Sequence, residues 1–243
     1  MWPRPRAPTS PVLEDGMVVR VGDTPVRLKV NPRARRVSIR VSADGAATAT
    51  APSRRALSQA LAFAQSRAGW LADQTAKAPE ARPFQPGQVV EIEGRSVTLI
   101  QGTGQAAARL VSPDLISAGG DAEGFNRRVI ALLKREAKAR LEAATERHAA
   151  RLGLPRPAVG LGDPRGRWGS CSPHRNSIRY SWRLILAPPQ VLDYVAAHEV
   201  GHLIHADHSP AFWAVVARLD PEWKAHRAWL RREGARLHAL GRG

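Results

Sequence analysis

Four histidines lie within eleven residues near the carboxyl end of the chain: His198, His202, His205 and His208. Residues four apart on a helix share a face, so the imidazoles of His198 and His202 can bind one cation. Glu199 lies beside that face, where a carboxylate can take a proton from a metal-bound water rather than bind the metal. The run His198-Glu199-Val200-Gly201-His202 therefore predicts a zinc-dependent hydrolase with Glu199 as its general base.

The third metal ligand is a choice among three residues, because a catalytic zinc site needs three protein ligands and an open position for water. His208 follows His202 by six residues, the spacing of metzincin-type sites, but those sites have a glycine where this chain has His205. His205 is a rival ligand if the helix continues one more turn. Asp207 is another, as a ligand or as an acceptor that orients an imidazole. We favour His208, since catalytic zinc sites commonly draw one ligand from outside the helix.

A metal-free alternative is a solvated, histidine-rich helix end. The surrounding helix argues against it, because the segment is apolar from Val191-Leu192 to Leu203-Ile204. A histidine-glutamate pair within so apolar a helix is costly to bury without a metal or another partner.

The elements around the histidines can be predicted from local patterns. Residues 177–184 alternate between two faces, which predicts a strand, and residues 167–172 are expected to be its antiparallel partner. Pro188-Pro189 opens the helix of the histidines. Two further helices are expected, because a cap residue precedes proline at Ser209-Pro210 and again at Asp220-Pro221. Their tryptophans look buried: Trp213, Trp223 and Trp229.

Several residues near the predicted strands are candidates for substrate binding. Gly169 and Ser170 would let an extended substrate approach the edge of the sheet, although an ordinary hairpin strand explains them equally well. Arg167, Arg179 and Arg183 are candidates for a phosphate or a terminal carboxylate. Arg179 and Arg183 are expected on one face of the strand, and a solvated face of the sheet is the simpler interpretation.

Three further side chains have two interpretations each. Cys171 is either a fourth metal ligand, which would make the site structural, or a small buried residue, as a free cysteine usually is. Tyr180 and Tyr194 could stabilise an oxyanion, but both positions also suit a core. We favour the structural interpretation of Cys171 and assign no role to the tyrosines.

The rest of the chain predicts an α+β protein. We expect a disordered tail over residues 1–16, a β-rich amino-terminal region over 17–121 with one helix at 54–74, and a zincin-like metallohydrolase domain over 122–243. That domain is expected to combine a short antiparallel sheet with the metal-binding active-site helix. Within these ranges we predict a linker at 75–87, a hairpin at 89–100, a loop at 101–121 and a long helix at 125–152. No internal repeat of useful length is visible.

The composition indicates a globular protein, with 243 residues of which 43% are hydrophobic. No apolar run approaches the roughly 18 residues that would cross a membrane. The basic start is not followed by an apolar stretch of signal-peptide type, so a cytoplasmic location without membrane contact is expected. The single cysteine excludes an internal disulfide. Nothing indicates an oligomeric state.

The formal net charge of +16 has two interpretations. One is contact with a polyanion through a basic surface. The other is composition, because 5 of the 37 basic residues are lysine and the other 32 are arginine, a bias typical of a GC-rich genome.

Three blocks of the sequence, RWGSCS at 167–172, YVAAHEVGH at 194–202 and HSPAFW at 208–213, are specific when they occur together. With them the chain resembles the YgjP-type family of zinc metallopeptidases, which is grouped with the SprT-like and WLM-type minimal zincins. The resemblance implies His198, His202 and His208 as ligands and Glu199 as catalytic acid and base. It departs from the family at Asp207, where an asparagine is frequent. It extends over most of the chain, because residues 33–52 and Trp70 look like the family's amino-terminal β region.

Three functions are compatible with this site. The preferred one is a metallopeptidase with a peptide substrate and one Zn²⁺ per chain, although three imidazoles also suit manganese, cobalt or nickel. The second is a pyrophosphatase-like hydrolase of nucleoside triphosphates or phosphate esters, with arginines that hold the nucleotide. The third is a nucleic-acid-associated protease that uses its positive charge for docking.

Overall fold

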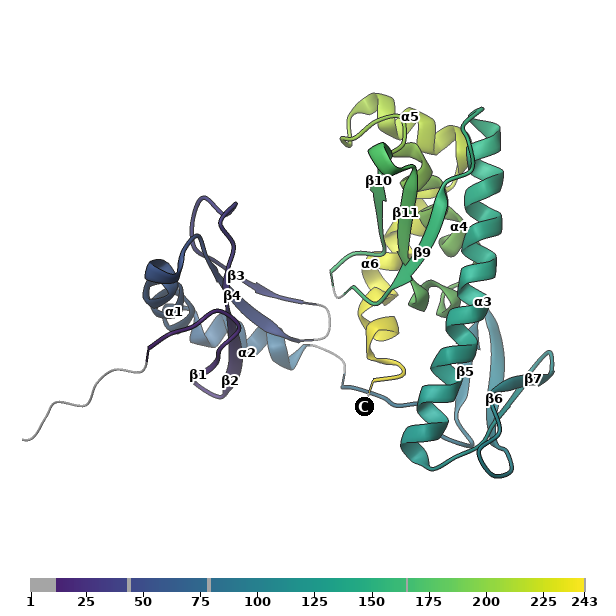
Figure 1. The fold of residues 1–243 in the computed structure, drawn as a ribbon, viewed down its shortest axis with the longest axis horizontal. Coiled ribbons are helices and arrows are strands. Elements are labelled where there is room, and N and C mark those ends of the chain that lie inside the picture. The colour runs from purple at the N-terminus through teal and green to yellow at the C-terminus, as the bar shows by residue number, and fades with distance from the viewer. Residues whose placement is uncertain (1–11, 43–44, 78–79, 165, 243) are drawn as a thin grey trace, which may run out of the picture. The chain divides into compact units, whose positions relative to one another are not determined.

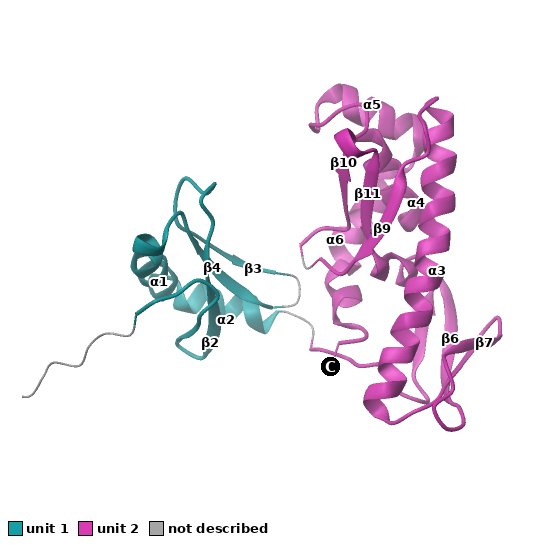
Figure 2. Cartoon of the chain, viewed as in Figure 1, with its two compact units in different colours: residues 1–78 teal, residues 79–243 magenta. Residues whose placement is uncertain are grey.

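The computed structural model describes residues 12–42, 45–77, 80–164 and 166–242, and its fold class is α+β, as predicted. The chain divides into two compact units, Met1–Ala78 and Pro79–Gly243 (Figure 2). The division falls within the predicted linker at 75–87. It differs from the predicted domain boundary between residues 121 and 122, because the second sheet of the chain shares its hydrophobic core with the helices that follow it.

A four-stranded sheet forms the first unit, in the order β1-β2-β4-β3. Strands β1 and β2 form an antiparallel hairpin, β2 and β4 are parallel, and β3 and β4 are antiparallel. The alternation of Val26, Leu28 and Val30 with polar residues directs one face of β2 toward a separate core. The strand bounds are Val18–Val21 for β1, Thr24–Val30 for β2, Ser38–Val41 for β3 and Ala47–Ala51 for β4.

One helix was predicted over residues 54–74, and the structure has three shorter pieces there. They are the 3₁₀ turn η1 (Arg54–Ala56), α1 (Leu57–Ser66) and α2 (Ala68–Ala76), with a break at Arg67. Of the tail predicted at 1–16, residues 1–11 lie outside the described residues. Gly16 donates to the carbonyl of Leu28, so the end of this segment is attached to the first sheet.

A second four-stranded sheet opens the second unit, in the order β5-β6-β8-β7. Its pairings repeat those of the first sheet: an antiparallel hairpin, a parallel pair and a second antiparallel pair. The predicted loop at 101–121 contains two of its strands, so that prediction was wrong. The strand bounds are Val89–Ile92 for β5, Arg95–Gln101 for β6, Arg109–Ser112 for β7 and Leu115–Ala118 for β8.

The two sheets are therefore copies of one topology, an internal repeat that the sequence analysis missed. In β1–β2 the facing pairs run from Val18 opposite Arg27 to Val21 opposite Thr24, with a two-residue turn. In β5–β6 the pairs have the same spacing, from Val89 opposite Thr98 to Ile92 opposite Arg95. Leu28 and Leu99 occupy equivalent positions, and both side chains are fully buried.

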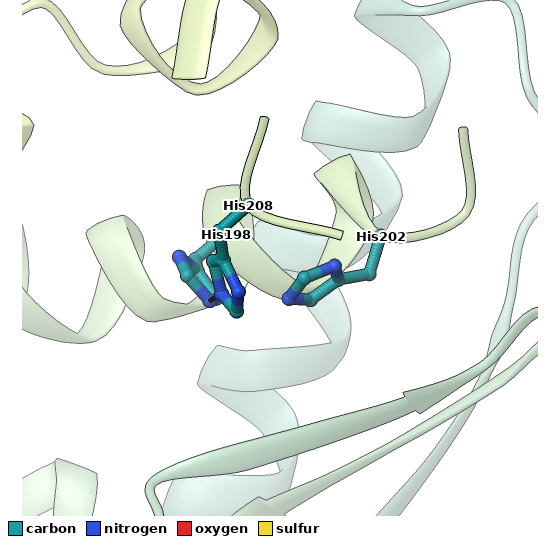
Figure 3. A group of neighbouring side chains, drawn as sticks. All are labelled: His198, His202 and His208. Carbon is teal, nitrogen blue, oxygen red and sulfur yellow. Dashed lines mark hydrogen bonds between the residues drawn. The ribbon is translucent and has the colours of Figure 1, made fainter. Parts of the chain in front are cut away.

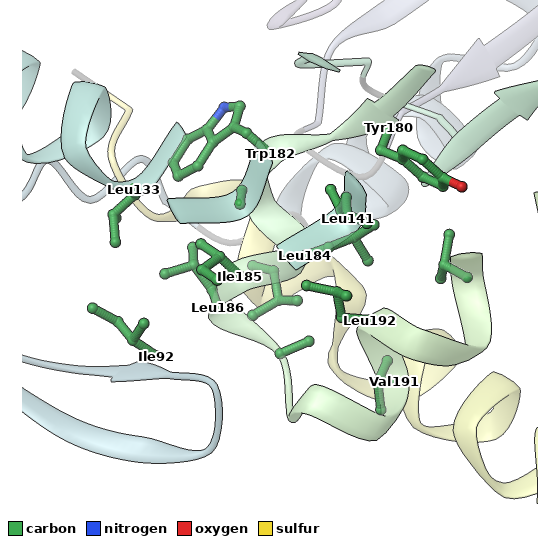
Figure 4. Close-up of a cluster of buried hydrophobic side chains, with 14 of the residues drawn as sticks. Ile92, Leu133, Leu141, Tyr180, Trp182, Leu184, Ile185, Leu186, Val191 and Leu192 are labelled. Carbon is green, nitrogen blue, oxygen red and sulfur yellow. The ribbon is translucent and has the colours of Figure 1, made fainter. Parts of the chain in front are cut away.

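Helix α3 (Ala122–Arg151) follows the second sheet and has Asp121 as its N-cap, whose carboxylate accepts from the Gly124 amide at 2.9 Å. Phe125, Val129 and Leu132 from α3 join Leu99 from the sheet in one hydrophobic cluster. Figure 4 shows another part of this cluster, where Ile92 of the sheet, Leu133 of α3 and Leu192 of α4 (Pro189–Gly201) belong to the same core. The second sheet thus shares its core with the rest of its unit. This shared core places the boundary before the sheet instead of after it.

A three-stranded sheet carries the residues next to the histidines, in the order β10-β11-β9. The antiparallel pair of β10 (Gly169–Ser172) and β11 (Ser177–Ser181) was predicted, but β9 (Ala158–Gly162) was not, and it pairs parallel to β11. The predicted antiparallel sheet is therefore mixed. The strand expected to reach residue 184 ends at Ser181, whose hydroxyl accepts from the Arg183 amide and caps the 3₁₀ helix η3 (Trp182–Leu186).

Three helices complete the second unit (Figure 1). Helix α4 (Pro189–Gly201) begins at the predicted proline, and α5 (Pro210–Leu219) has the predicted Ser209 cap. Helix α6 (Trp223–Ala239) begins two residues after its predicted proline. The three tryptophans expected to be buried are only partly so. No helix in the described part of the chain is long and apolar enough to cross a membrane.

Candidate metal centre

Three imidazoles converge at the end of α4: those of His198, His202 and His208 (Figure 3). One nitrogen from each lies within 4.8 Å of the others, and Nε2 of His198 is 3.2 Å from Nε2 of His208. Zn–N bonds of about 2.0–2.1 Å in a tetrahedron place two ligand nitrogens about 3.3 Å apart. The three side chains therefore fit a zinc ion, with a small inward movement of His202.

The three imidazoles reach this point from two elements. His198 lies in the last turn of α4, and His202 is the C-cap residue of that helix. The chain then turns back, and the Ser209 hydroxyl accepts from the Phe212 amide to begin α5 directly after His208. The ring of Phe212 is fully buried and lies 4.4 to 4.9 Å from the rings of all three histidines. Phe212 thus forms a rigid floor under the site, a role that the sequence analysis missed although the residue falls in the block HSPAFW.

The rival ligands have other roles in the structure. Helix α4 ends before His205, so that imidazole does not join the three others. The main-chain carbonyl of His205 instead lies 3.0 Å from Nδ1 of His202, where it can accept a hydrogen bond and leave Nε2 of His202 unprotonated. The Asp207 carboxylate accepts from the Ser209 amide at 3.2 Å and so shapes the turn that presents His208.

The environment favours the neutral form of His198 and His202. Burial is the main reason that the pKa of His198 falls to about 3, and the nearby His202, His208 and Arg227 lower it further. Burial also lowers the pKa of His202. A neutral imidazole has a free lone pair for a metal, so these shifts favour metal binding at neutral pH.

Glu199 lies on the same helix with only 5% of its surface exposed. Burial raises the pKa of its carboxyl group to about 8, against a smaller opposing effect of Arg167. A Cβ atom on Gly169 would lie 2.5 Å from Oε1 of Glu199, so this carboxyl group is packed directly against the backbone of β10. The absence of a side chain at Gly169 thus makes room for Glu199.

An open cleft of about 680 Å³ lies over Glu199 and the histidines. Of the predicted substrate-binding residues, Arg167, Gly169 and Ser170 line it, and Arg179 and Arg183 do not. Arg183 is 1% exposed and pairs with Asp163 at 2.7 Å. Arg179 is exposed beside β9, over Gly160. The prediction that both arginines share one face of a strand was wrong, because the strand ends between them.

The remaining candidates, Cys171, Tyr180 and Tyr194, differ in whether they line the cleft or the core. Cys171 lines the cleft but is not one of the converging ligands, and burial raises its pKa to about 11. Tyr180 is buried with its hydroxyl 2.9 Å from that of Thr145, so it is a core residue. Tyr194 lines the cleft, and its pKa is raised to about 12, chiefly by burial.

Helix α6 supplies cleft residues that the sequence analysis did not consider, Arg227 and Arg231. Their spacing of four residues is the one signal in the sequence that they share a helix face. Which way that face points depends on how α6 packs, and the local sequence does not determine this.

The model of the YgjP-like metallopeptidase domain matches residues 35–233, which is most of the chain. The chain belongs to the YgjP-like metallopeptidase family. The resemblance carried by the three sequence blocks is thereby confirmed, and this YgjP-like protein is a metal-dependent peptidase. Membership also implies a divalent metal ion, for which the three histidines are a suitable site.

Among solved structures, the YgjP-like protein is similar to the metallopeptidase zymogen abylysin of Pyrococcus abyssi. The two are 23% identical, with a TM-score of 0.34, and the match covers 37% of this chain and 93% of abylysin. No curated protein matches the chain significantly.

Proposed function

We propose that the YgjP-like protein is a zinc-dependent metallopeptidase whose metal is held by His198, His202 and His208 and whose general base is Glu199. The observation that supports this most strongly is the convergence of three imidazoles beside a buried carboxyl group. Three protein ligands leave one position open, which is typical of catalytic rather than structural zinc sites.

A zinc ion at this site would polarise the peptide carbonyl and acidify the attacking water. The chain's own contribution is the handling of protons. Glu199 lies on α4 with its carboxyl group against Gly169. It takes a proton from that water and delivers it to the leaving nitrogen. A pKa raised by burial suits both steps, because the group is neither too weak as a base nor too weak as an acid near neutral pH.

Strand β10 is suited to hold an extended peptide beside Glu199. It lies at the edge of its three-stranded sheet, and Gly169, Ser170 and Cys171 from it line the cleft. A peptide that adds to this edge would form main-chain hydrogen bonds along β10, so its backbone would pass directly over the histidines.

The decisive variant is Glu199→Gln, which removes the base but none of the three ligands. We expect zinc content to stay at one ion per chain, while the kcat for cleavage of unfolded casein falls by about 10²- to 10⁴-fold. Glu123→Gln is the matched control, because that carboxylate is exposed at the start of α3. Full turnover by the Glu199 variant would contradict the proposed base.

Metal removal tests the ligands separately. A chelator should abolish cleavage, and zinc, manganese, cobalt and nickel added back in turn should show which ion restores it. His208→Ala should lose zinc, whereas His205→Ala should keep it. A nucleoside triphosphate panel on the same samples completes the test, because release of pyrophosphate without peptide cleavage would overturn the peptidase assignment.

A further inference from the structure

Arg227 and Arg231 lie on one face of α6, and this face lines the metal cleft. Arg227 and Arg231 are four residues apart, so their side chains lie one above the other. Both line the cleft, and Arg167 lines it from the segment before β10. Glu199, which faces the backbone of Gly169, is the one carboxylate among the described lining residues. The cleft therefore carries a local excess of positive charge.

Arg227 is held in place by stacked aromatic rings. Its guanidinium lies 4.8 Å from the ring of Trp213, and that ring stacks on Trp223 at 4.3 Å with an angle of 16° between the planes. The ring of Trp213 also lies 5.7 Å from those of His198 and His208. A planar guanidinium on a fixed indole loses little further freedom when it binds a ligand. Arg227 is thus preorganised beside the metal centre.

The helix that carries these arginines also packs against the residue that precedes β10. Trp168, the residue before β10, stacks on His238 of α6 at 4.5 Å. It also packs so closely on Gly234 that a Cβ atom there would lie 2.9 Å from the indole. These contacts connect α6 to β10 and fix the position of the arginines relative to the strand proposed to bind the peptide.

Neither Arg227 nor Arg231 has an acidic partner among the residues that the structure describes. Two like charges four apart on a helix repel each other. The next arginines along α6 differ, because Arg232 and Arg236 both pair with Glu233. Arg227 and Arg231 thus place two charges without an acidic partner on the face that lines the cleft, where an anionic ligand would offset their repulsion.

We propose that Arg227 and Arg231 form a subsite for a carboxylate of the peptide substrate and make the enzyme selective for acidic peptides. This rests on the proposed peptidase function and specifies its substrate class. The guanidinium fork matches a carboxylate with two parallel hydrogen bonds, a geometry that few other peptide groups satisfy. The carboxylate comes from an Asp or Glu side chain or from the peptide's own carboxyl terminus.

Binding, rather than cleavage, is the test, so that its result is independent of Glu199 chemistry. Zinc-loaded Glu199→Gln protein is titrated with a labelled alanine-rich peptide that carries one Asp, placed at each position in turn, and with the matching Asn peptides. We expect the best Asp peptide to bind about tenfold more tightly than its Asn partner. Amidation of the peptide carboxyl terminus separates that carboxylate from the side chains. The titration is repeated after chelation, because a preference that depends on the arginines persists without zinc.

Arg227→Gln and Arg231→Gln, each made in the Glu199→Gln background, should remove most of this preference. Arg232→Gln should keep it, since that residue lies on another face and pairs with Glu233. Equal affinity for Asp and Asn peptides, together with equal affinity for peptides with a free and an amidated carboxyl terminus, would overturn the subsite. A preference that survives the loss of both arginines would also overturn it. Displacement of the acidic peptide by a nucleoside triphosphate that binds far more tightly would also overturn it, in favour of a phosphate site. If acidic peptides bind selectively but the wild type cleaves none, the subsite stands and the peptidase proposal fails.

Discussion

The two four-stranded sheets of this chain have the same topology and hairpin register but different surroundings. The first sheet is covered by α1 and α2 and has a hydrophobic core of its own. The second sheet shares one cluster with α3 and with the helices of the metal centre. Its hairpin turn also donates a backbone hydrogen bond at 2.9 Å, from Glu93 to the carbonyl of Ile185 in η3. One motif thus serves once as an independent unit and once as part of the support of the metal centre.

This comparison explains where the chain divides. A sheet becomes part of a neighbouring unit when its buried face has no helix of its own to cover it. The first sheet is followed directly by such helices, whereas the second is followed by α3, which also packs against η3 and α4. The location of shared apolar surface, and not the topology of the strands, determines the boundary.

The largest expected difference between the copies follows from Leu28→Ala and Leu99→Ala. The two leucines are equivalent and fully buried, so each change should cost about 2–5 kcal/mol. Leu28→Ala should destabilise the first unit alone. Leu99→Ala should destabilise the unit that contains the proposed zinc site. Calorimetry with and without zinc distinguishes them, because zinc raises the midpoint of only the transition that includes its site.

An effect of either variant on both transitions would show that the units unfold together. Such a result would contradict the division of the chain at residue 78. A matched surface change, Lys77→Ala at the end of the first unit, should leave both midpoints unchanged, because that side chain is exposed.

Acid should weaken the two units unequally, and Asp193 is a main reason. Burial acts to raise the pKa of Asp193, but the hydrogen bond and charge of His148 together with Arg147 outweigh it, so that the pKa is lowered. A carboxyl group with a lowered pKa in the folded state stabilises the fold above its unfolded pKa of about 4. This stabilisation is lost as the pH falls below 4 through the folded value. The second unit should therefore lose stability in this window.

Asp193→Asn tests this contribution directly. It removes the ionic contact between α3 and the helix of the histidines, 3.0 Å from His148, and should cost about 1–3 kcal/mol at pH 7. The unfolding midpoint of the second unit should then vary less between pH 5 and pH 3 than in the wild type. In the described part of the first unit the comparable pair is Arg20 with Asp23, which is exposed. Asp23→Asn is therefore the control, and an equal response of both units would contradict the assignment.

The convergence of the three histidines could be predicted from the sequence better than the sheets, because it depends on contacts of shorter range along the chain. The positions of His198, Glu199 and His202 follow from helix periodicity, and the Ser209 cap presents His208 from a few residues away. Strands β7 and β8 are only four residues each, and β7 is largely exposed, so they lack an alternating pattern. Residues 18–28 and 89–99 form hairpins of the same register, and this similarity is an indirect signal that two further strands follow the second hairpin as they follow the first.

The errors at the arginines have a different cause. Alternation continues past Ser181 in the sequence, but the partner that buries Arg183 is Asp163, which is twenty residues earlier. The roles of Arg227 and Arg231 depend on the packing of Trp168 against Gly234, two residues far apart in the chain. Local periodicity contains no information on such contacts, so the structure is needed to assign them.

The smallest expected difference lies at the two hairpin turns. Glu93 has a left-handed backbone with φ of 50°, a conformation that disfavours glutamate, yet its carboxylate accepts from Arg140 of α3 at 2.8 Å. The equivalent turn in the first copy is Gly22-Asp23. Its ion pair, among the described residues, joins the Asp23 carboxylate to Arg20 of the same hairpin at 3.5 Å. Arg140→Gln should cost about 0.5 kcal/mol, because the Glu93 side chain is mostly buried, whereas Arg20→Gln should have no measurable effect. Urea unfolding of the two variants measures both. A larger loss for Arg20→Gln would reverse the comparison, because it would assign the greater structural role to the turn that contacts no neighbouring helix.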